Sequence, residues 1–131
     1  EHSQVPLLCF VEDHCCSGAY FVACACDEIL VDEVSVLGSI GVITESFGID
    51  QALENLGVDR RVQTNTAGRW KGANDPFSKE TLDGRAQTQF LLDRTFSHFE
   101  ESVRAGRGDR LMFTEAKLEA KMLLGETTVS E

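Results

Sequence analysis

Short apolar runs separated by polar or glycine-containing breaks fill the first third of the chain. The run Val5–Glu12 is almost continuously apolar, which predicts a buried strand of a parallel sheet. Gly18–Asp27 is apolar on nearly every side and predicts a deeply buried helix. Glu28–Asp32 then predicts a second short strand. The order strand, helix, strand indicates an α/β fold with a mostly parallel sheet flanked by helices.

The segments around these elements contain turn residues and glycine. Asp13 and His14 are expected to form the turn that leads from the first strand to the helix. Val34–Gly41 is interrupted by glycine, and Val42–Ile43 is expected to begin another short extended piece. Near the end of the chain, Thr114–Leu124 predicts a final helix with charge pairs four residues apart.

The middle of the chain alternates helical and irregular patterns. Gly48–Gly57 predicts a short amphipathic helix whose last glycine is its C-terminal stop. Val58–Thr64 predicts a polar strand near a sheet edge, and Thr66–Pro76 is rich in turn residues and predicts a loop. Ser78–Ala105 carries one apolar stripe among charged residues, which predicts the longest helix of the protein.

Composition narrows the class of function. The formal net charge of −10 argues against a nucleic-acid partner, because phosphate contacts need clustered Lys and Arg. It equally disfavours binding to anionic lipid surfaces. No apolar run is long enough to span a bilayer, and no secretory signal pattern is visible. The hydrophobic fraction of 42% is enough for one packed core.

The cysteines do not form a recognisable disulfide or metal pattern. Their count of five is odd and no CxxC pair occurs, so we expect five free thiols, no bound metal and a reducing compartment. Thiol titration of the unfolded, unreduced protein would test this expectation. The cysteines are Cys9, Cys15, Cys16, Cys24 and Cys26.

Ser17 is the first candidate for chemistry. It lies among small residues, immediately before Gly18 and at the start of the apolar helix. A tight turn of this kind places a hydroxyl at a helix N-terminus with backbone N–H groups pointing outward, which suits a nucleophile whose reaction creates an oxyanion. The alternative is that Ser17 only caps the helix.

Lys71 and Ser39 are the second candidates. Lys71 lies in a glycine-containing loop beside Trp70, and an aromatic neighbour can shield an amine from water. A neutral lysine could act as general base for a serine, and a second hydroxyl such as that of Ser39 could orient the amine. Lysines in loops are otherwise solvated surface charges, and spacing alone does not bring these residues together.

Four motifs occur together in one order: S-G-A-Y at 17–20, A-C-A-C-D-E-I at 23–29, G-S-I-G-V at 38–42 and T-A-G-R-W-K-G-A-N-D-P-F at 66–77. Together they resemble the signal peptide peptidase family of the protease IV and SohB type. The resemblance implies that Ser17 is the nucleophile, Lys71 the general base and Ser39 the residue that orients the lysine. It also implies that the Gly18 N–H is an oxyanion donor, that no cofactor or metal is needed, and that the fold is of the Clp-protease/crotonase type.

The resemblance also sets expectations for the extent of the domain. We expect residues 1–131 to be a single but incomplete peptidase domain, with a family-like core at 1–111 and a divergent helix and tail at 112–131. The family's upstream part, which carries a second oxyanion donor and any membrane anchor, has no counterpart here, so any membrane contact would come through that absent segment. We therefore expect the chain alone to be nearly inactive and to self-associate. The family implies extended hydrophobic peptide substrates, such as cleaved signal peptides, and a homo-oligomeric ring.

Two other functions stay open from the sequence. An acyl-CoA enzyme of the crotonase type shares the glycine-rich turn and the buried helix, but it has no need of a serine and lysine pair. A non-catalytic oligomerisation module of a truncated peptidase is the second alternative.

Overall fold

The computed structural model describes residues 5–110 and 122–124, which belong to two compact units. The first unit consists of residues 1–42 and 95–131, and the second of residues 43–94. The long helix α3 (Leu82–Arg107) contributes its first residues to the second unit and its last residues to the first. The predicted α/β class is confirmed by small parallel strands combined with helices.

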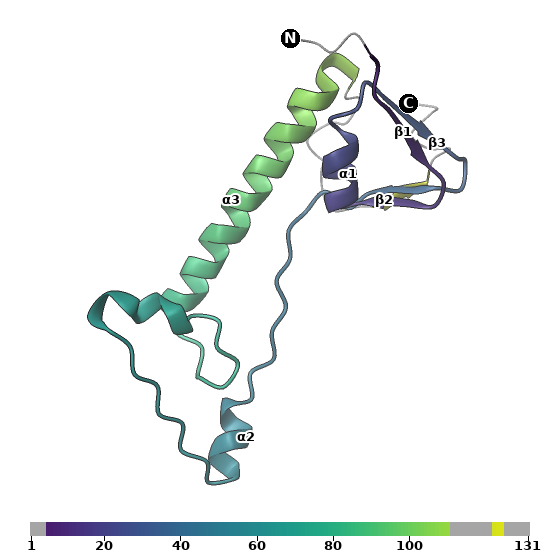
Figure 1. Cartoon of the computed structure of the whole chain (residues 1–131). Helices are drawn as coiled ribbons and strands as arrows, with labels where there is room; N and C mark the ends of the chain where they lie inside the picture. Colours follow the sequence, from purple (N-terminus) through teal and green to yellow (C-terminus); the bar gives the residue numbers. More distant parts are fainter. Residues whose placement is uncertain (1–4, 111–121, 125–131) are drawn as a thin grey trace. The chain divides into compact units, whose positions relative to one another are not determined.

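Two parallel strands open the first unit. β1 (Leu8–Val11) pairs in parallel with β3 (Glu28–Val31), with Cys9 opposite Ile29, and Figure 1 shows the two strands side by side. Both strands were predicted from apolar runs, but each is shorter than its run. The burial expected for the first strand is wrong, because Val11 is buried but Phe10 is 69% exposed. The strands can run parallel because the segment between them, which includes a helix, returns the chain to the end of the sheet where β1 began.

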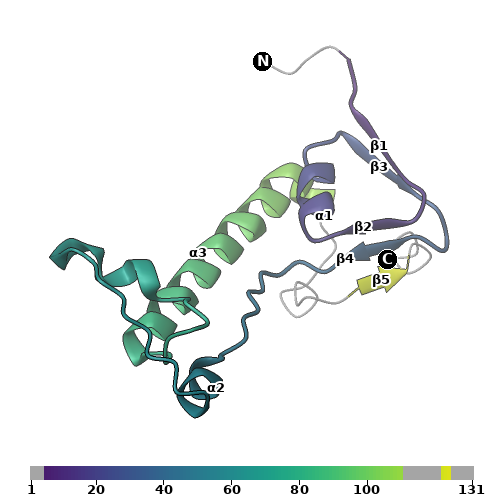
Figure 2. The ribbon, with the colours of Figure 1, turned by 60° about the horizontal axis from the view of Figure 1, so that its bottom comes forward.

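A second, mixed sheet follows directly from the first (Figure 2). β2 (His14–Cys16) pairs in parallel with β4 (Val36–Gly38), and β5 (Met122–Leu124) joins β4 in antiparallel orientation. The predicted turn at Asp13–His14 is therefore wrong at its second residue, since His14 begins β2. The extended piece expected at 42–43 forms no strand, and the helix predicted over 114–124 is wrong at 122–124, while its remainder lies outside the described residues.

α1 (Gly18–Ala23) is the helix that precedes β3, and it ends earlier than Asp27. The prediction that this helix is deeply buried is wrong, because within it Tyr20 and Ala23 are buried whereas Val22 is 68% exposed. Its shortness has a local cause. The Asp27 N–H donates to the Leu7 carbonyl at 2.8 Å, and the Leu7 N–H donates to Asp27 Oδ2 at 2.7 Å. These bonds hold the chain in the direction of β3. Arg107 and Arg110 donate to the carbonyls of Cys26 and Asp27, in the turn between α1 and β3.

The core of the first unit joins the strands, α1 and the last turns of α3. The Phe21 and Phe99 rings pack edge to face, with centroids 5.5 Å apart. Gly106 lets α3 approach α1 closely, because a Cβ there would lie 2.1 Å from the Cys24 carbonyl oxygen. The buried apolar side chains are Val11, Cys15, Tyr20, Ala23, Cys24, Leu37, Ile40, Phe99 and Val103.

The second unit contains a short helix, a 3₁₀ helix and the start of α3. α2 (Asp50–Asn55) is followed by Gly57 at φ 70°, so the predicted glycine stop is confirmed. The strand predicted over 58–64 is wrong, because these residues form no ladder, and the loop predicted over 66–76 contains the 3₁₀ helix η1 (Thr66–Gly72).

α3 confirms the predicted long helix but starts four residues later and ends two residues later than expected, at Leu82 and Arg107 rather than Ser78 and Ala105. Thr81 precedes it, and its Oγ1 accepts the N–H of Gly84 at 3.0 Å, which is the capping contact of a helix N-terminus. Ser78 instead belongs to a turn, because its N–H donates to the Asp75 carbonyl at 3.1 Å. A short 3₁₀ helix η2 (Gly108–Arg110) follows α3.

Candidate active site

Ser17 and Ser39 occupy equivalent places at one edge of the second sheet. β2 ends at Cys16 and β4 ends at Gly38, and these two residues face each other in the parallel register. Each serine is the next residue of its strand. The Ser17 N–H donates to the Gly38 carbonyl at 2.9 Å, so the pairing continues into the serine itself. The structure therefore brings together two of the serines predicted from sequence, at the carboxyl ends of adjacent parallel strands, where α/β proteins place their ligands.

Both serines have left-handed backbone conformations. Ser17 has φ 52° and ψ −120°, and Ser39 has φ 51°. They are the non-glycine residues with positive φ in the described part of the chain. Such a conformation costs a non-glycine residue about 1–3 kcal/mol and is retained where the surroundings enforce it. The strain falls on the two residues that the sequence singled out for chemistry.

The Ser17 side chain is accessible to solvent. The residue is exposed and occupies the N-cap position of α1, as the capping alternative expected, but its hydroxyl makes no capping hydrogen bond. Its carbonyl accepts the Phe21 N–H at 3.0 Å, which starts the helix without using the hydroxyl. Gly18 follows at the first helical position and is exposed. Ser39 is half-buried beside them.

Lys71 lies in η1 and therefore in the second unit, whereas Ser17 and Ser39 lie in the first. Lys71 is exposed and its neighbour Trp70 is 40% exposed, so the shielding that the sequence suggested is not seen in this chain by itself. The pairing of the lysine with either serine stays a prediction.

The segment after Lys71 is fixed by Asp75, which the sequence analysis did not single out. Arg60 donates to Asp75 Oδ2, which also accepts the Ser78 hydroxyl at 2.8 Å. The Phe77 N–H donates to Asp75 Oδ1 at 3.2 Å, and the Arg60 guanidinium lies 5.0 Å from the centre of the Phe77 ring. The hydrogen bond from Arg60 is the main reason why the pKa of Asp75 lies below its usual value. The Asp-Pro-Phe motif thus builds the turn behind the lysine.

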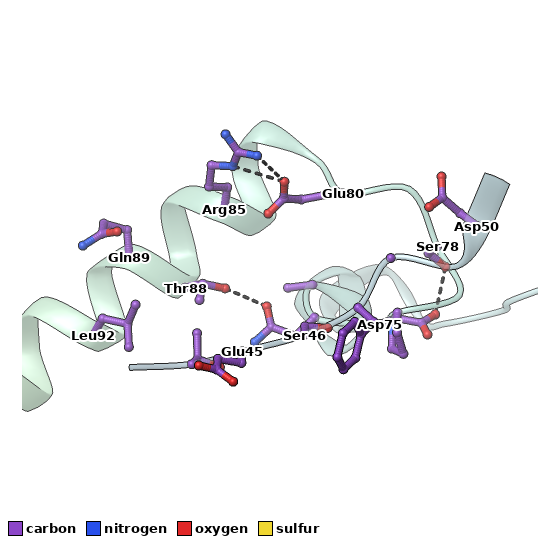
Figure 3. A pocket seen from close by; sticks show the side chains of 16 residues that line it. Glu45, Ser46, Asp50, Asp75, Ser78, Glu80, Arg85, Thr88, Gln89 and Leu92 are labelled. Carbon is purple, nitrogen blue, oxygen red and sulfur yellow. Dashed lines mark hydrogen bonds and ion pairs between the residues drawn. The ribbon is translucent and has the colours of Figure 1, made fainter. Parts of the chain in front are cut away.

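A cavity of about 480 Å³ lies within the second unit. Figure 3 shows Glu45 and Ser46 on one side, with Arg85, Thr88 and other side chains of α3 on the other. The Thr88 hydroxyl lies 2.6 Å from Asn74 Oδ1, and Arg85 pairs with Glu80. None of the candidate catalytic residues lines this cavity, so it adds nothing to the site at the strand ends.

The cysteines are free in the structure, and several belong to the core. Burial is the main cause that raises the pKa of the Cys15 thiol to about 11, and burial also raises the pKa of Tyr20 to about 12. These groups are therefore uncharged at neutral pH and behave as packing residues. Among residues 5–110 and 122–124, no group of His, Cys, Asp and Glu side chains is arranged to hold a metal ion.

The sequence analysis missed two residues that fix the backbone near the candidate residues. Ser35 is fully buried and bonds to the backbone between β1 and β2, and Arg60 pairs with Asp75 across a stretch that was predicted to be a strand. The pattern Asp32-x-x-Ser35 is a turn signal that could have located the first residue, but nothing in the pattern reveals its second bond. Arg60 carried no local signal, because its partner lies fifteen residues away.

Comparison with known protein families decides the classification. Residues 1–129 match the family described as Peptidase family S49. The chain belongs to peptidase family S49. The S49 match covers both units, including the two serines at the strand ends and the lysine in η1.

Two of the relatives that match this chain are named as proteases and one is named as an antiporter. A SohB protein of Haemophilus influenzae, named a probable protease, is 30% identical over 103 residues, which cover 79% of this chain and 29% of that protein. MJ0651 of Methanocaldococcus jannaschii, also named as a protease, is 29% identical over 121 residues, or 92% of this chain and 38% of that protein. A protein of Brucella abortus named Na(+)/H(+) antiporter NhaA is 40% identical over 111 residues, or 85% of this chain and 15% of that protein.

The S49 chain thus spans well under half of the length of these relatives. Within the described residues, no helix has both the length and the apolar character needed to cross a bilayer.

Proposed function

We propose that this S49 chain carries the serine and lysine of a serine endopeptidase, with Ser17 as nucleophile, Lys71 as general base and Ser39 as the group that orients the lysine. The observation that supports the proposal most is the pair of serines in left-handed conformations at the ends of adjacent parallel strands. Strained backbone concentrates at functional sites, and here it coincides with the residues that the family motifs indicate. The exposed hydroxyl of Ser17 is accessible to a peptide.

In the proposed reaction, Ser17 Oγ attacks the carbonyl carbon of the peptide bond, and neutral Lys71 Nζ accepts the hydroxyl proton. The oxyanion that forms accepts a hydrogen bond from the Gly18 N–H. When the C–N bond breaks, Lys71 returns its proton to the leaving amine and an ester remains on Ser17. Water then attacks the ester, again giving a proton to Lys71, and the hydroxyl of Ser17 is restored as the carboxylic acid leaves.

Gly18 supplies one oxyanion donor, and a tetrahedral intermediate needs converging donors. A missing donor lowers turnover by about 10²–10³-fold. We therefore expect the longer protein to supply the second donor, and the isolated chain to be nearly inactive. The substrates we propose are extended hydrophobic peptides of the signal-peptide type, and the complete fold we propose is of the Clp-protease/crotonase type.

We also propose that the protein forms a homo-oligomer. The second unit exposes large apolar side chains, which a second copy would cover. An oligomer could also bring Lys71 of one copy to Ser17 of its neighbour and remove the amine from water. The exposed side chains that support this are Ile43, Phe47, Leu56, Val58, Val62, Phe77 and Leu82. The partly buried thiols are consistent with a reducing compartment.

The proposal is tested on the full-length protein by peptide hydrolysis and by labelling with a serine-directed fluorophosphonate. Ser17→Ala and Lys71→Ala should each lower turnover by at least about 10³-fold, and the double variant should be no worse, because the two residues act as a unit. Ser39→Ala should be damaging but not fatal. Lys79→Ala is the matched control, because Lys79 is an exposed lysine of the same unit, and it should leave turnover unchanged. Near-normal turnover of Lys71→Ala would refute the assignment.

A pH profile separates a lysine base from other bases. Because only a neutral amine accepts a proton, turnover should rise as the pH increases from neutral to mildly alkaline values. A flat or falling profile in the full-length protein would contradict the role of Lys71. The oligomer is tested separately by sedimentation of this chain, and a strictly monomeric chain would contradict that part. The crotonase alternative would require acyl-CoA binding, which isothermal titration would detect.

A further inference from the structure

Among the first-unit residues whose burial the structure describes, Ser35 is the buried polar one, with 0% of its surface exposed. It lies in the link between β3 and β4, immediately before Val36. A fully buried hydroxyl is costly unless it is hydrogen-bonded, so the use that the fold makes of it is informative.

The Ser35 hydroxyl forms its hydrogen bonds with backbone groups. Its Oγ lies 2.8 Å from the Val11 carbonyl and 3.0 Å from the Glu12 carbonyl, and it accepts the Asp32 N–H at 3.2 Å. The Val11 carbonyl lies at the end of β1 and the Glu12 carbonyl in the link to β2, whereas Asp32 and Ser35 belong to the link between β3 and β4. One side chain therefore ties the two inter-strand links together.

These two links lead directly into β2 and β4, the paired strands at whose ends the candidate site lies. Directly after Ser35, the Val36 N–H donates to the Asp13 carbonyl at 2.7 Å, and the β2–β4 ladder then runs to its last bond, from the Ser17 N–H to the Gly38 carbonyl. The ladder is short, since β2 and β4 each have three residues. A shift at its beginning therefore reaches Ser17 and Ser39 within one strand length.

We propose that Ser35 is a positioning residue, which holds β2 and β4 in register and thereby places Ser17 beside Ser39. The inference rests on the proposed peptidase function for its kinetic consequence but not for its structural one. A small displacement of a reacting group, near 1 Å, lowers turnover by about 10²-fold, so a loosened register should act on turnover more than on substrate binding.

The test compares Ser35→Ala with Val103→Ala in the full-length protein. Val103 is also fully buried in the first unit, on α3, and its truncation removes core packing but none of the hydrogen bonds of Ser35. In Ser35→Ala, we expect kcat to fall by roughly 10–100-fold with KM within about twofold. Hydrogen exchange of the Ser17 and Val36 amides should accelerate selectively. In Val103→Ala, exchange should rise across the whole unit, and kcat per folded molecule should stay within about twofold of the wild type.

Ser35→Cys supplies a graded variant, because a thiol has nearly the size of the hydroxyl but is a weaker donor. It should give intermediate values of both kcat and amide exchange, and it keeps the inference testable if Ser35→Ala does not fold. Unchanged exchange at Ser17 and Val36 in a folded Ser35→Ala protein would overturn the inference. A fall in kcat that only follows the folded fraction would overturn it as well. Selective exchange in a protein whose Ser17 proves to have no catalytic role would support the register function while refuting the peptidase proposal.

Discussion

The interactions that stabilise the interior of each unit of this S49 chain differ between the two units. In the part of the first unit whose burial the structure describes, nine apolar side chains are buried, and they come from the strands, α1, the residues next to them and α3. Among the described side chains of the second unit, no apolar residue larger than glycine is buried. Phe47 and Leu82 are each 85% exposed. Its segments are joined instead by bonds between polar groups, such as the Ile49 N–H to the Pro76 carbonyl at 2.8 Å.

This difference assigns separate tasks to the two units. Apolar burial is the main source of folding free energy, so the first unit has the means to hold the two serines rigidly. Exposed polar contacts contribute little on their own, so the second unit, with Lys71, depends more on whatever covers its apolar surface. Under the proposed function, Ser17 would be positioned by the chain itself, and Lys71 would be positioned by assembly.

The largest expected effect comes from truncating the same residue type in each unit. Phe99 is 6% exposed and packs against Phe21, whereas Phe47 is 85% exposed. Phe99→Ala should lower the free energy of unfolding by about 3–5 kcal/mol, because it removes buried contacts and leaves a cavity. Phe47→Ala should change it by less than about 0.5 kcal/mol. Urea denaturation followed by circular dichroism would measure both, and equal losses would contradict the division into a packed unit and an unpacked one.

A second prediction concerns glycine. An alanine at position 106 would place its Cβ 2.1 Å from the Cys24 carbonyl oxygen, whereas a Cβ at Gly72 would meet nothing within 4 Å. Gly106→Ala should therefore destabilise the first unit by about 1–3 kcal/mol, although alanine is normally the better helix residue. Gly72→Ala is the control and should be nearly neutral. Thermal unfolding of both variants decides the matter, and a stabilised Gly106→Ala protein would show that α1 and α3 are not in close contact.

The smallest effect is expected in the second unit and depends on pH. The hydrogen bond from Arg60 keeps the pKa of Asp75 below its ordinary value of 3.8. A lowered pKa means that this carboxylate stabilises the fold above pH 3.8 and that its contribution disappears as the pH falls through the lower, folded value. Asp75→Asn should therefore speed exchange of the Phe77 amide at neutral pH, and the difference from wild type should vanish in acid. Asp59→Asn is the control, since Asp59 is 70% exposed in its pair with Arg61. A difference that persisted below the folded pKa would rule out the charge as its cause.

Sequence reasoning succeeded where a local apolar pattern marks the element. The runs that became β1, β3 and α3 were predicted from their apolar content and spacing, although β3 has no buried residue and Leu82 of α3 is 85% exposed. It failed at β2, where His14-Cys15-Cys16 has no strand pattern and pairs only because β4 is held beside it. It failed again over 58–64, where an alternating pattern met no partner strand.

The candidate site shows the same division between local and distant information. Ser17, Ser39 and Lys71 could be singled out because glycine neighbours and family motifs are local features. The left-handed backbone of both serines could not be predicted, since it is imposed by the parallel register of β2 and β4. The bonds of Ser35 link residues more than twenty positions apart, and no local pattern encodes them.

The first unit is built from two stretches of chain, and residues 43–94 are inserted between them. Closing such an insertion costs conformational entropy that grows only with the logarithm of its length, so doubling it would add about 0.6 kcal/mol. The strands around Ser17 pair across short sequence separations, whereas Phe99 must return to α1 across the insertion. We therefore expect the strands to pair early in folding and α3 to dock late, with a rate that falls with contact order. Length variation in the segment that contains Lys71 would then slow folding while hardly weakening the unit that contains Ser17.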